Sequence, residues 1–258
     1  MTFGQTVLLS AFAGATIFLG LPVGRMRVSP RVQVMLTAAA AGVVLFLLWD
    51  ILSHAVEPLE AALEAAQAGT GTALDAAVDA VALAGSLAVG LMSIVLVNRR
   101  LRGTRGEMDL RQIAMGTAVG LGLHNFSEGL AIGQSSATGA TSLALLLVIG
   151  FALHNATEGF GIAAPLASGP QPSWSFLITA GIVGGGPTFL GGVVGYTFVS
   201  PLVSIIFLGV AAGALIHVFN EMVSVSRRFA DPIAANLALI LGLIIALATD
   251  IILTLAGA

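Results

Sequence analysis

All four histidines of the chain have a carboxylate four residues away. The pairs are Asp50–His54, His124–Glu128, His154–Glu158 and His217–Glu221. A separation of four residues places two side chains on the same face of a helix, one turn apart. The chain has only 13 acidic residues in 258, so four pairs among four histidines point to a shared role. Imidazole and carboxylate without thiolate form a ligand set for divalent cations.

The strongest local signal is a segment that occurs twice, 30 residues apart. It reads GLGLHNFSEG at 120–129 and GFALHNATEG at 150–159. In each copy, His and Glu share one helix face, and the Asn three residues before the Glu reaches the same point from its other flank. Together the copies supply two imidazoles, two carboxylates and two amide oxygens, enough for one or two ions of the Zn²⁺ type. The candidate ligands are His124, Asn125, Glu128, His154, Asn155 and Glu158.

The composition of the chain predicts a membrane environment for these residues. The chain is 57% hydrophobic and 9% charged, it has no cysteine, and its mean hydropathy is +1.01. A soluble domain has about 25% charged residues, and a soluble fold could not bury this much apolar surface. We therefore predict an all-α integral membrane protein in contact with lipid, since helices satisfy their own backbone polar groups and the short alternating segments of a barrel are missing. A net charge of −3 gives no indication of a nucleic-acid partner.

Eight apolar segments are long enough to cross a bilayer, and we expect them to form a single transmembrane domain over residues 1–258. They are about 3–22, 33–54, 76–97, 112–133, 141–165, 174–199, 203–224 and 233–256. The first is expected to be a span rather than a signal peptide, because no basic residue precedes its apolar run.

With eight spans, all 10 arginines fall in loops on one side. By the positive-inside rule that side is cytoplasmic and both termini are extracytoplasmic, as in a multi-pass protein of the cell (inner or plasma) membrane.

The depth of the paired residues suggests a route for an ion. His124 and His154 lie about 12 or 13 residues into antiparallel neighbouring spans, so their motifs should meet near the bilayer midplane. Ionisable groups at that depth usually mark a site or a pathway; the structural alternative is a polar clamp between the two helices. The remaining candidates lie toward the outer face (Asp50, His54, Asp250) and toward the cytoplasm (His217, Glu221). We interpret the series as a stepwise cation route, with interfacial polar clusters as the alternative for each end pair.

Two further segments bear on the packing of the spans. The stretch AVEPLEAALEAAQAG at 55–69 is expected to extend the second span above the membrane as a helix, with an acidic loop that is either simply solvated or attracts cations. The sixth span has glycines at 181, 184–186, 191, 192 and 195 around Pro187. These glycines would allow close helix packing, whereas the proline also permits a kink or a hinge.

At HNFSEG (124–129) and HNATEG (154–159), the chain resembles the ZIP family of divalent-metal transporters, in particular its bacterial zinc-transporter branch. The fourth and fifth spans of that family carry motifs similar to His-Asn-x-Pro-Glu-Gly. The resemblance implies import of Zn²⁺, or of Fe²⁺, Mn²⁺, Co²⁺ or Cd²⁺, as a transported substrate, through a central and often two-metal site, commonly in a homodimer. It transfers ligand roles to the six residues of the doubled motif and to Glu221 of the seventh span. Neither enzymatic activity nor an organic cofactor is expected.

The chain departs from the family pattern in three places. Ser127 and Thr157 replace the two motif prolines, so the helix breaks that those prolines impose are not forced here. Gly186 precedes Pro187 where the family often has a glutamate, and the seventh span has one acid, Glu221, where the family often has two. A complete second metal position is therefore not expected from the sixth span.

Two other functions would use the same ligands. A membrane-embedded metalloenzyme, such as an intramembrane hydrolase, needs an open metal position and a general base. Zinc proteases place that base directly after the first histidine, where this chain has Asn125 and Asn155. A family member that senses metal without transporting it would follow from the missing prolines and the missing acid. A series of ligands from the outer to the inner face favours transport.

Overall fold

The computed structural model describes residues 1–102, 109–167, 169–198, 200–227 and 231–255; within these ranges, the side chains of residues 97, 98, 100–102, 154, 225 and 252–254 are not described. The α-helices are α1 (Phe3–Ala15), α2 (Pro30–Gln67), α3 (Ala73–Arg102), α4 (Leu110–Ala137), α5 (Thr141–Ala163), α6 (Trp174–Thr197), α7 (Pro201–Ser226) and α8 (Pro232–Leu255). Three short 3-10 segments accompany them: η1 (Thr16–Leu19) and η2 (Leu21–Arg25) after α1, and η4 (Ala164–Leu166) after α5.

Each predicted span corresponds to one of these helices, which confirms the all-α, multi-pass class. Within the described ranges, seven helical stretches are long and apolar enough to cross a membrane. Helix α4, which carries the first copy of the motif, is 28 residues long but is not among the seven. At about 1.5 Å per residue it is still long enough to span the bilayer. Helix α5 carries the same motif and is among the seven, because it also has the apolar run LALLLVI at 143–149, which α4 lacks.

Two boundaries differ from a simple series of spans. Helix α2 continues to Gln67, so the helical extension predicted at 55–69 is present. The first span is not one α-helix over 3–22, because the chain changes to 3-10 geometry after Ala15. The hydroxyl of Thr16 donates to the carbonyl of Ala13 and to that of Ala152 on α5, and Pro22 has no N–H to continue an α-helix. These contacts accompany the change to 3-10 geometry where the chain passes α5.

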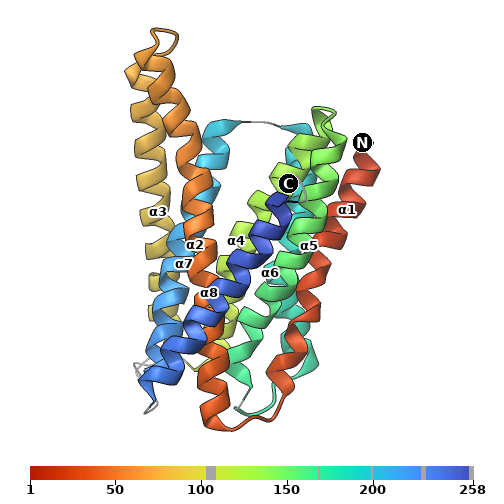
Figure 1. Cartoon of the computed structure of the whole chain (residues 1–258), viewed down its shortest axis with the longest axis vertical. Coiled ribbons are helices and arrows are strands. Elements are labelled where there is room, and N and C mark those ends of the chain that lie inside the picture. Colours follow the sequence, from red (N-terminus) through yellow and green to blue (C-terminus); the bar gives the residue numbers. More distant parts are fainter. Residues whose placement is uncertain (103–108, 168, 199, 228–230, 256–258) are drawn as a thin grey trace.

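The helices alternate in direction, and both termini lie at the same end of the bundle (Figure 1). At that end, the α2–α3 hairpin projects beyond the other helices (Figure 1). At the opposite end, η2, α3, α5 and α7 finish and α2, α4, α6 and α8 begin. Because the described arginines lie in or beside these helix ends, we call this the arginine end. In an eight-span chain, the first, third, fifth and seventh loops lie on one side of the membrane, and the loops at the arginine end are these four.

Glycines bring the helix backbones into direct contact. On α4 and α6, a Cβ added at Gly129 would collide with the carbonyl oxygen of Thr188, and one at Gly191 with that of Phe126. Lipid tails are as apolar as the helices, so association in a membrane depends on such close packing. Equivalent glycine contacts join α1 to α6, α2 to α8, α3 to α7 and α5 to η1 (Gly14, Gly185, Gly42, Gly242, Gly90, Gly213, Gly159). The glycines of the sixth span therefore serve close packing.

Gly186 is the exception in α6 and provides a matched control for this packing. A Cβ there would meet only the Cγ2 atom of Ile182, at 3.8 Å, which is an ordinary contact. We expect Gly191→Ala to lower the free energy of unfolding by about 1–3 kcal/mol through overpacking. Gly186→Ala should lower it by less, because its Cβ meets no other helix and only the following Pro187 disfavours a side chain at this position of a helix. Thermal unfolding of both variants in detergent micelles measures the difference, and equal midpoints would contradict this account of the packing.

Candidate metal centre

The two copies of the motif lie on neighbouring antiparallel helices that run without a break. Helix α4 continues through His124, Asn125 and Glu128, and α5 continues through Asn155 and Glu158. No proline interrupts either helix at the motif, so the backbone carbonyls there stay within the helices. The groups available in the gap between α4 and α5 are therefore side chains.

The structure brings one imidazole and two carboxylates together between these helices. The Nε2 atom of His124 lies 3.4 Å from Oε1 of Glu128 and 3.8 Å from Oε1 of Glu158. One ligand atom from each residue lies within 4.8 Å of the other two, and all three residues are buried. Ligands about 2.0–2.2 Å from a tetrahedral ion would be roughly 3.3 Å apart. A small contraction of this triad would therefore suit a divalent ion.

The two asparagines cross between the helices and hold the carboxylates. The amide nitrogen of Asn125 on α4 donates to Glu158 on α5 at 2.7 Å, and to the carbonyl of Gly184 on α6 at 3.0 Å. In the opposite sense, Asn155 on α5 donates to Glu128 on α4 at 3.5 Å. Asn155 also donates to the carbonyl of Ala13 on α1 at 3.1 Å. Each asparagine thus fixes the carboxylate of the other helix and ties it to a third helix.

The amide oxygens of Asn125 and Asn155 remain as acceptors. Both Oδ1 atoms are buried, and neither has a hydrogen-bond partner among the described residues. A buried acceptor without a donor is costly, but it is a suitable oxygen ligand for a cation. The sequence predicted the asparagines as oxygen ligands, and it did not predict that their amide nitrogens would position the carboxylates.

The charges of the centre also suit a divalent cation. Once deprotonated, two carboxylates beside one neutral imidazole would carry a charge of −2 in the interior of the bundle, where unpaired charge is expensive. The asparagine donors offset part of this cost, and an ion of charge +2 would neutralise the rest. The side chain of His154 lies outside the described residues, although α5 places residue 154 one turn before Glu158. Its predicted ligand role stays a prediction.

The predicted outer residues gather on α2 and α8. The Nδ1 atom of His54 lies 3.6 Å from Oδ1 of Asp50 and 3.0 Å from the backbone carbonyl of Asp50. The side chain of His54 is 59% exposed, whereas that of Asp50 is 21% exposed. Asp50 lies within electrostatic range of His124 and Glu128, and Asp250 lies within range of Asp50 and His54. The charge of Asp50 is therefore close enough to His124 and Glu128 to affect them.

The predicted inner residues form a separate pair on α7. The Nε2 atom of His217 lies 3.8 Å from Oε1 of Glu221, and both side chains are partly buried. Among the described residues, the three-ligand group contains His124, Glu128 and Glu158 and does not include this pair. Glu221 lies beside His217 on α7, and its predicted role as a metal ligand stays a prediction.

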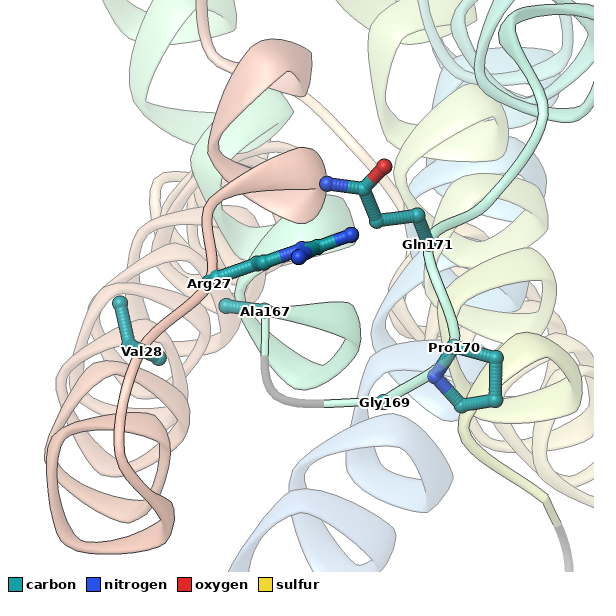
Figure 2. A pocket seen from close by; sticks show the side chains of 6 residues that line it. All are labelled: Arg27, Val28, Ala167, Gly169, Pro170 and Gln171. Carbon is teal, nitrogen blue, oxygen red and sulfur yellow. The ribbon is translucent and has the colours of Figure 1, made fainter.

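A hollow of about 440 Å³ at the arginine end has a different chemistry. It lies between the η2–α2 loop and the α5–α6 loop, and Figure 2 shows Arg27 and Gln171 extending into it from these two loops. The described residues that line it are Arg27, Val28, Ala167, Gly169, Pro170 and Gln171. None of them has a carboxylate or an imidazole, so this hollow is not the metal centre.

The functional groups that the sequence did not reveal are backbone carbonyls. Those of Gly184 and Ala13 accept the second hydrogen bond of each asparagine. No residue type marks such an acceptor in a sequence. The only available signal was the glycine-rich character of α6, which indicated that its backbone could approach α4.

An all-helical membrane bundle with a buried imidazole and dicarboxylate group defines a membrane protein that can bind a metal ion between its helices. Comparison with known families specifies the class. The model of the ZIP zinc transporter family matches residues 102–250, more than half of the chain. The chain belongs to the ZIP family, as the resemblance of the doubled motif indicated. It is therefore a metal transporter rather than an enzyme, and the hydrolase alternative is not supported. Comparison with curated proteins gave no match.

The crossed asparagine contacts lead to a test of metal affinity. Asn125→Ala would remove the amide that donates to Glu158 and to Gly184, so the carboxylate would lose its orientation. Loss of such supporting contacts typically lowers metal affinity about 10- to 100-fold. Asn236→Ala is the matched control, because Asn236 is exposed and donates only within α8, to the carbonyl of Pro232 at 2.7 Å. Competition with a fluorescent chelator measures both affinities, and an unchanged affinity for Asn125→Ala would refute the positioning role.

Proposed function

We propose that this protein imports divalent transition-metal ions, with Zn²⁺ as the best-fitting substrate, toward the cytoplasm of the cell. The observation that carries the proposal is the buried group of His124, Glu128 and Glu158, contributed by two helices in a chain of the ZIP family. Asn125, Asn155 and His154 complete the proposed ligand set from the same two helices. The arginine end is the proposed cytoplasmic face, by the positive-inside rule, and the membrane is the cell (inner or plasma) membrane.

The choice of metal rests on the donor atoms. Nitrogen and oxygen donors without sulfur suit Zn²⁺, Mn²⁺, Fe²⁺ and Co²⁺, and they exclude a strong preference for ions that require thiolate. A centre with one described imidazole and two carboxylates resembles the ligand sets of four-coordinate zinc sites with one open position. Zn²⁺, with ligands about 2.0–2.2 Å away, also fits the short separations within the triad.

The outer and inner pairs support a stepwise route. Asp50, His54 and Asp250 would attract an ion from the outer face, since His54 is exposed and Asp50 is coupled electrostatically to the centre. His217 and Glu221 on α7 would receive it on the arginine side. Each step exchanges one imidazole–carboxylate pair for another, so the ion is never left without ligands in the interior.

Metal flux into liposomes tests the function directly. We expect the double variant Glu128→Ala plus Glu158→Ala to reduce zinc uptake to the background of empty vesicles, because it removes both carboxylates of the triad. The matched control is Glu60→Ala plus Glu64→Ala, two exposed acids on the projecting part of α2, which should retain most of the flux. Equal flux in the first variant and the wild type would refute the site. Tight zinc binding without any flux in the wild type would instead indicate the sensing function.

The route makes a separate prediction for its two ends. His54→Ala and His217→Ala should each slow zinc uptake several-fold, because each removes one ligand pair outside the centre. Neither variant should change the equilibrium affinity of the central site by more than about twofold, since neither residue belongs to the triad. Initial rates of uptake and equilibrium binding are to be measured on the same preparations. Wild-type rates in both variants would eliminate the stepwise route while leaving the central site intact.

A further inference from the structure

Three polar residues in or near the centre have a buried apolar residue about one turn closer to the arginine end. Leu47 precedes Asp50 on α2, Leu121 precedes His124 on α4, and Ile162 follows Glu158 on α5. These three apolar residues have 0% or nearly 0% exposure and belong to one contiguous cluster of buried side chains. We call them the apolar layer. A hydrated ion cannot cross such a layer, because constrictions of this kind exclude water.

The opposite side of the centre carries polar side chains. One turn outward from Asp50 on α2 is His54, whose side chain is 59% exposed. The apolar layer thus separates the centre from the arginine end, whereas the polar pair of Asp50 and His54 lies on the other side of the centre. An ion that leaves at the arginine end requires the apolar layer to separate.

A buried hydrogen bond lies between the apolar layer and the arginine end. The amide nitrogen of Gln33, in the first turns of α2, donates to the carbonyl of Pro165 in η4 at 2.6 Å. Gln33 is only 4% exposed. Carbonyls at the end of a helix have no partner within it, so Gln33 satisfies an acceptor at the end of α5 and joins that end to α2. A buried polar side chain at such a junction favours one arrangement of the two helices over others.

The loops on either side of this bond approach each other in the same region. The backbone N–H of Val28 donates to the carbonyl of Ala167 at 3.3 Å, and the amide of Gln171 donates to the carbonyl of Arg25 at 3.0 Å. Figure 2 shows these two loops bordering the hollow at the arginine end. They lie closer to the solvent than Gln33, so they close the outside of the same passage.

We propose that the Gln33–Pro165 hydrogen bond is the latch of an inner gate whose seal is the apolar layer. When the bond breaks, the end of α5 separates from α2, Ile162 moves away from Leu47, and the centre becomes accessible from the arginine end. The inference rests on the proposed function in that it gives the transport route an inner gate. The closure itself is a property of the contacts and requires no ion to be moved.

The absence of cysteine from the chain allows a direct test. Leu121→Cys places a single thiol in the apolar layer, and Thr72→Cys places one on the exposed α2–α3 turn as a marker of the opposite side. In vesicles with the protein in a known orientation, a membrane-impermeant maleimide is applied from the arginine side. We expect Gln33→Met, which keeps the size of the side chain but removes the donor, to raise the labelling rate of Leu121→Cys about five- to tenfold, the effect of one buried hydrogen bond on an opening equilibrium. Gln67→Met is the matched control, because Gln67 is an exposed glutamine at the far end of the same helix.

The outcomes separate the gate from the transport proposal. Faster labelling from the arginine side in Gln33→Met but not in Gln67→Met supports the latch. An unchanged rate, an equal rise in both variants, or a rise only from the opposite side overturns it. Retained zinc affinity shows that Gln33→Met is folded; if it is not, Gln33→Asn, whose amide is one methylene short of Pro165, takes its place. Because labelling does not depend on flux, a protein that transports nothing can still pass or fail this test.

Discussion

Two carboxylates buried between α4 and α5 impose the constraint on which the rest of the structure depends. Glu128 and Glu158 lie in the same gap between the helices and are buried, so they depend on protein groups rather than water for hydrogen bonds. Each accepts a hydrogen bond from an asparagine of the other helix, which fixes the register of the two helices as firmly as it fixes the carboxylates. Hydrogen bonds alone do not neutralise a buried carboxylate, so a bound cation would stabilise both groups once they lose their protons.

The close packing of α6 against α4 also helps to orient the ligands of the centre. Asn125 reaches the carbonyl of Gly184 only because the two backbones nearly touch. Gly122 and Gly129 lie one turn before and one turn after Asn125, on the same face of α4, and each meets a backbone carbonyl of α6. A larger residue at either position would push α6 away and remove the second acceptor of the Asn125 amide. The glycines that hold the bundle together therefore also orient the metal ligands.

Local patterns in the sequence were sufficient to predict most of the fold and the grouping of His124, Glu128 and Glu158. Hydropathy predicted the eight helices, and the spacing of four predicted that His124 and Glu128 share a face. The short loop between antiparallel spans predicted that Glu158 would meet them. The donor role of Asn125 could not be predicted, because it depends on the rotation of α6 and on a backbone carbonyl.

The departures from the family motif have a coherent physical meaning in this bundle. Without the motif prolines, α4 and α5 remain continuous, so no freed backbone carbonyl is available as a ligand and the side chains supply the donors. The position at which the family often has a sixth-span acid is Gly186, where an added Cβ would meet only Ile182 of its own helix. This chain has no acid at that position, and one group of three ligands, His124, Glu128 and Glu158, is found among the described residues. Two of the ligands, His124 and Glu128, belong to α4, and the third, Glu158, belongs to α5. A shift of α5 relative to α4 would therefore move Glu158 away from the other two ligands while the distance between His124 and Glu128 stayed the same.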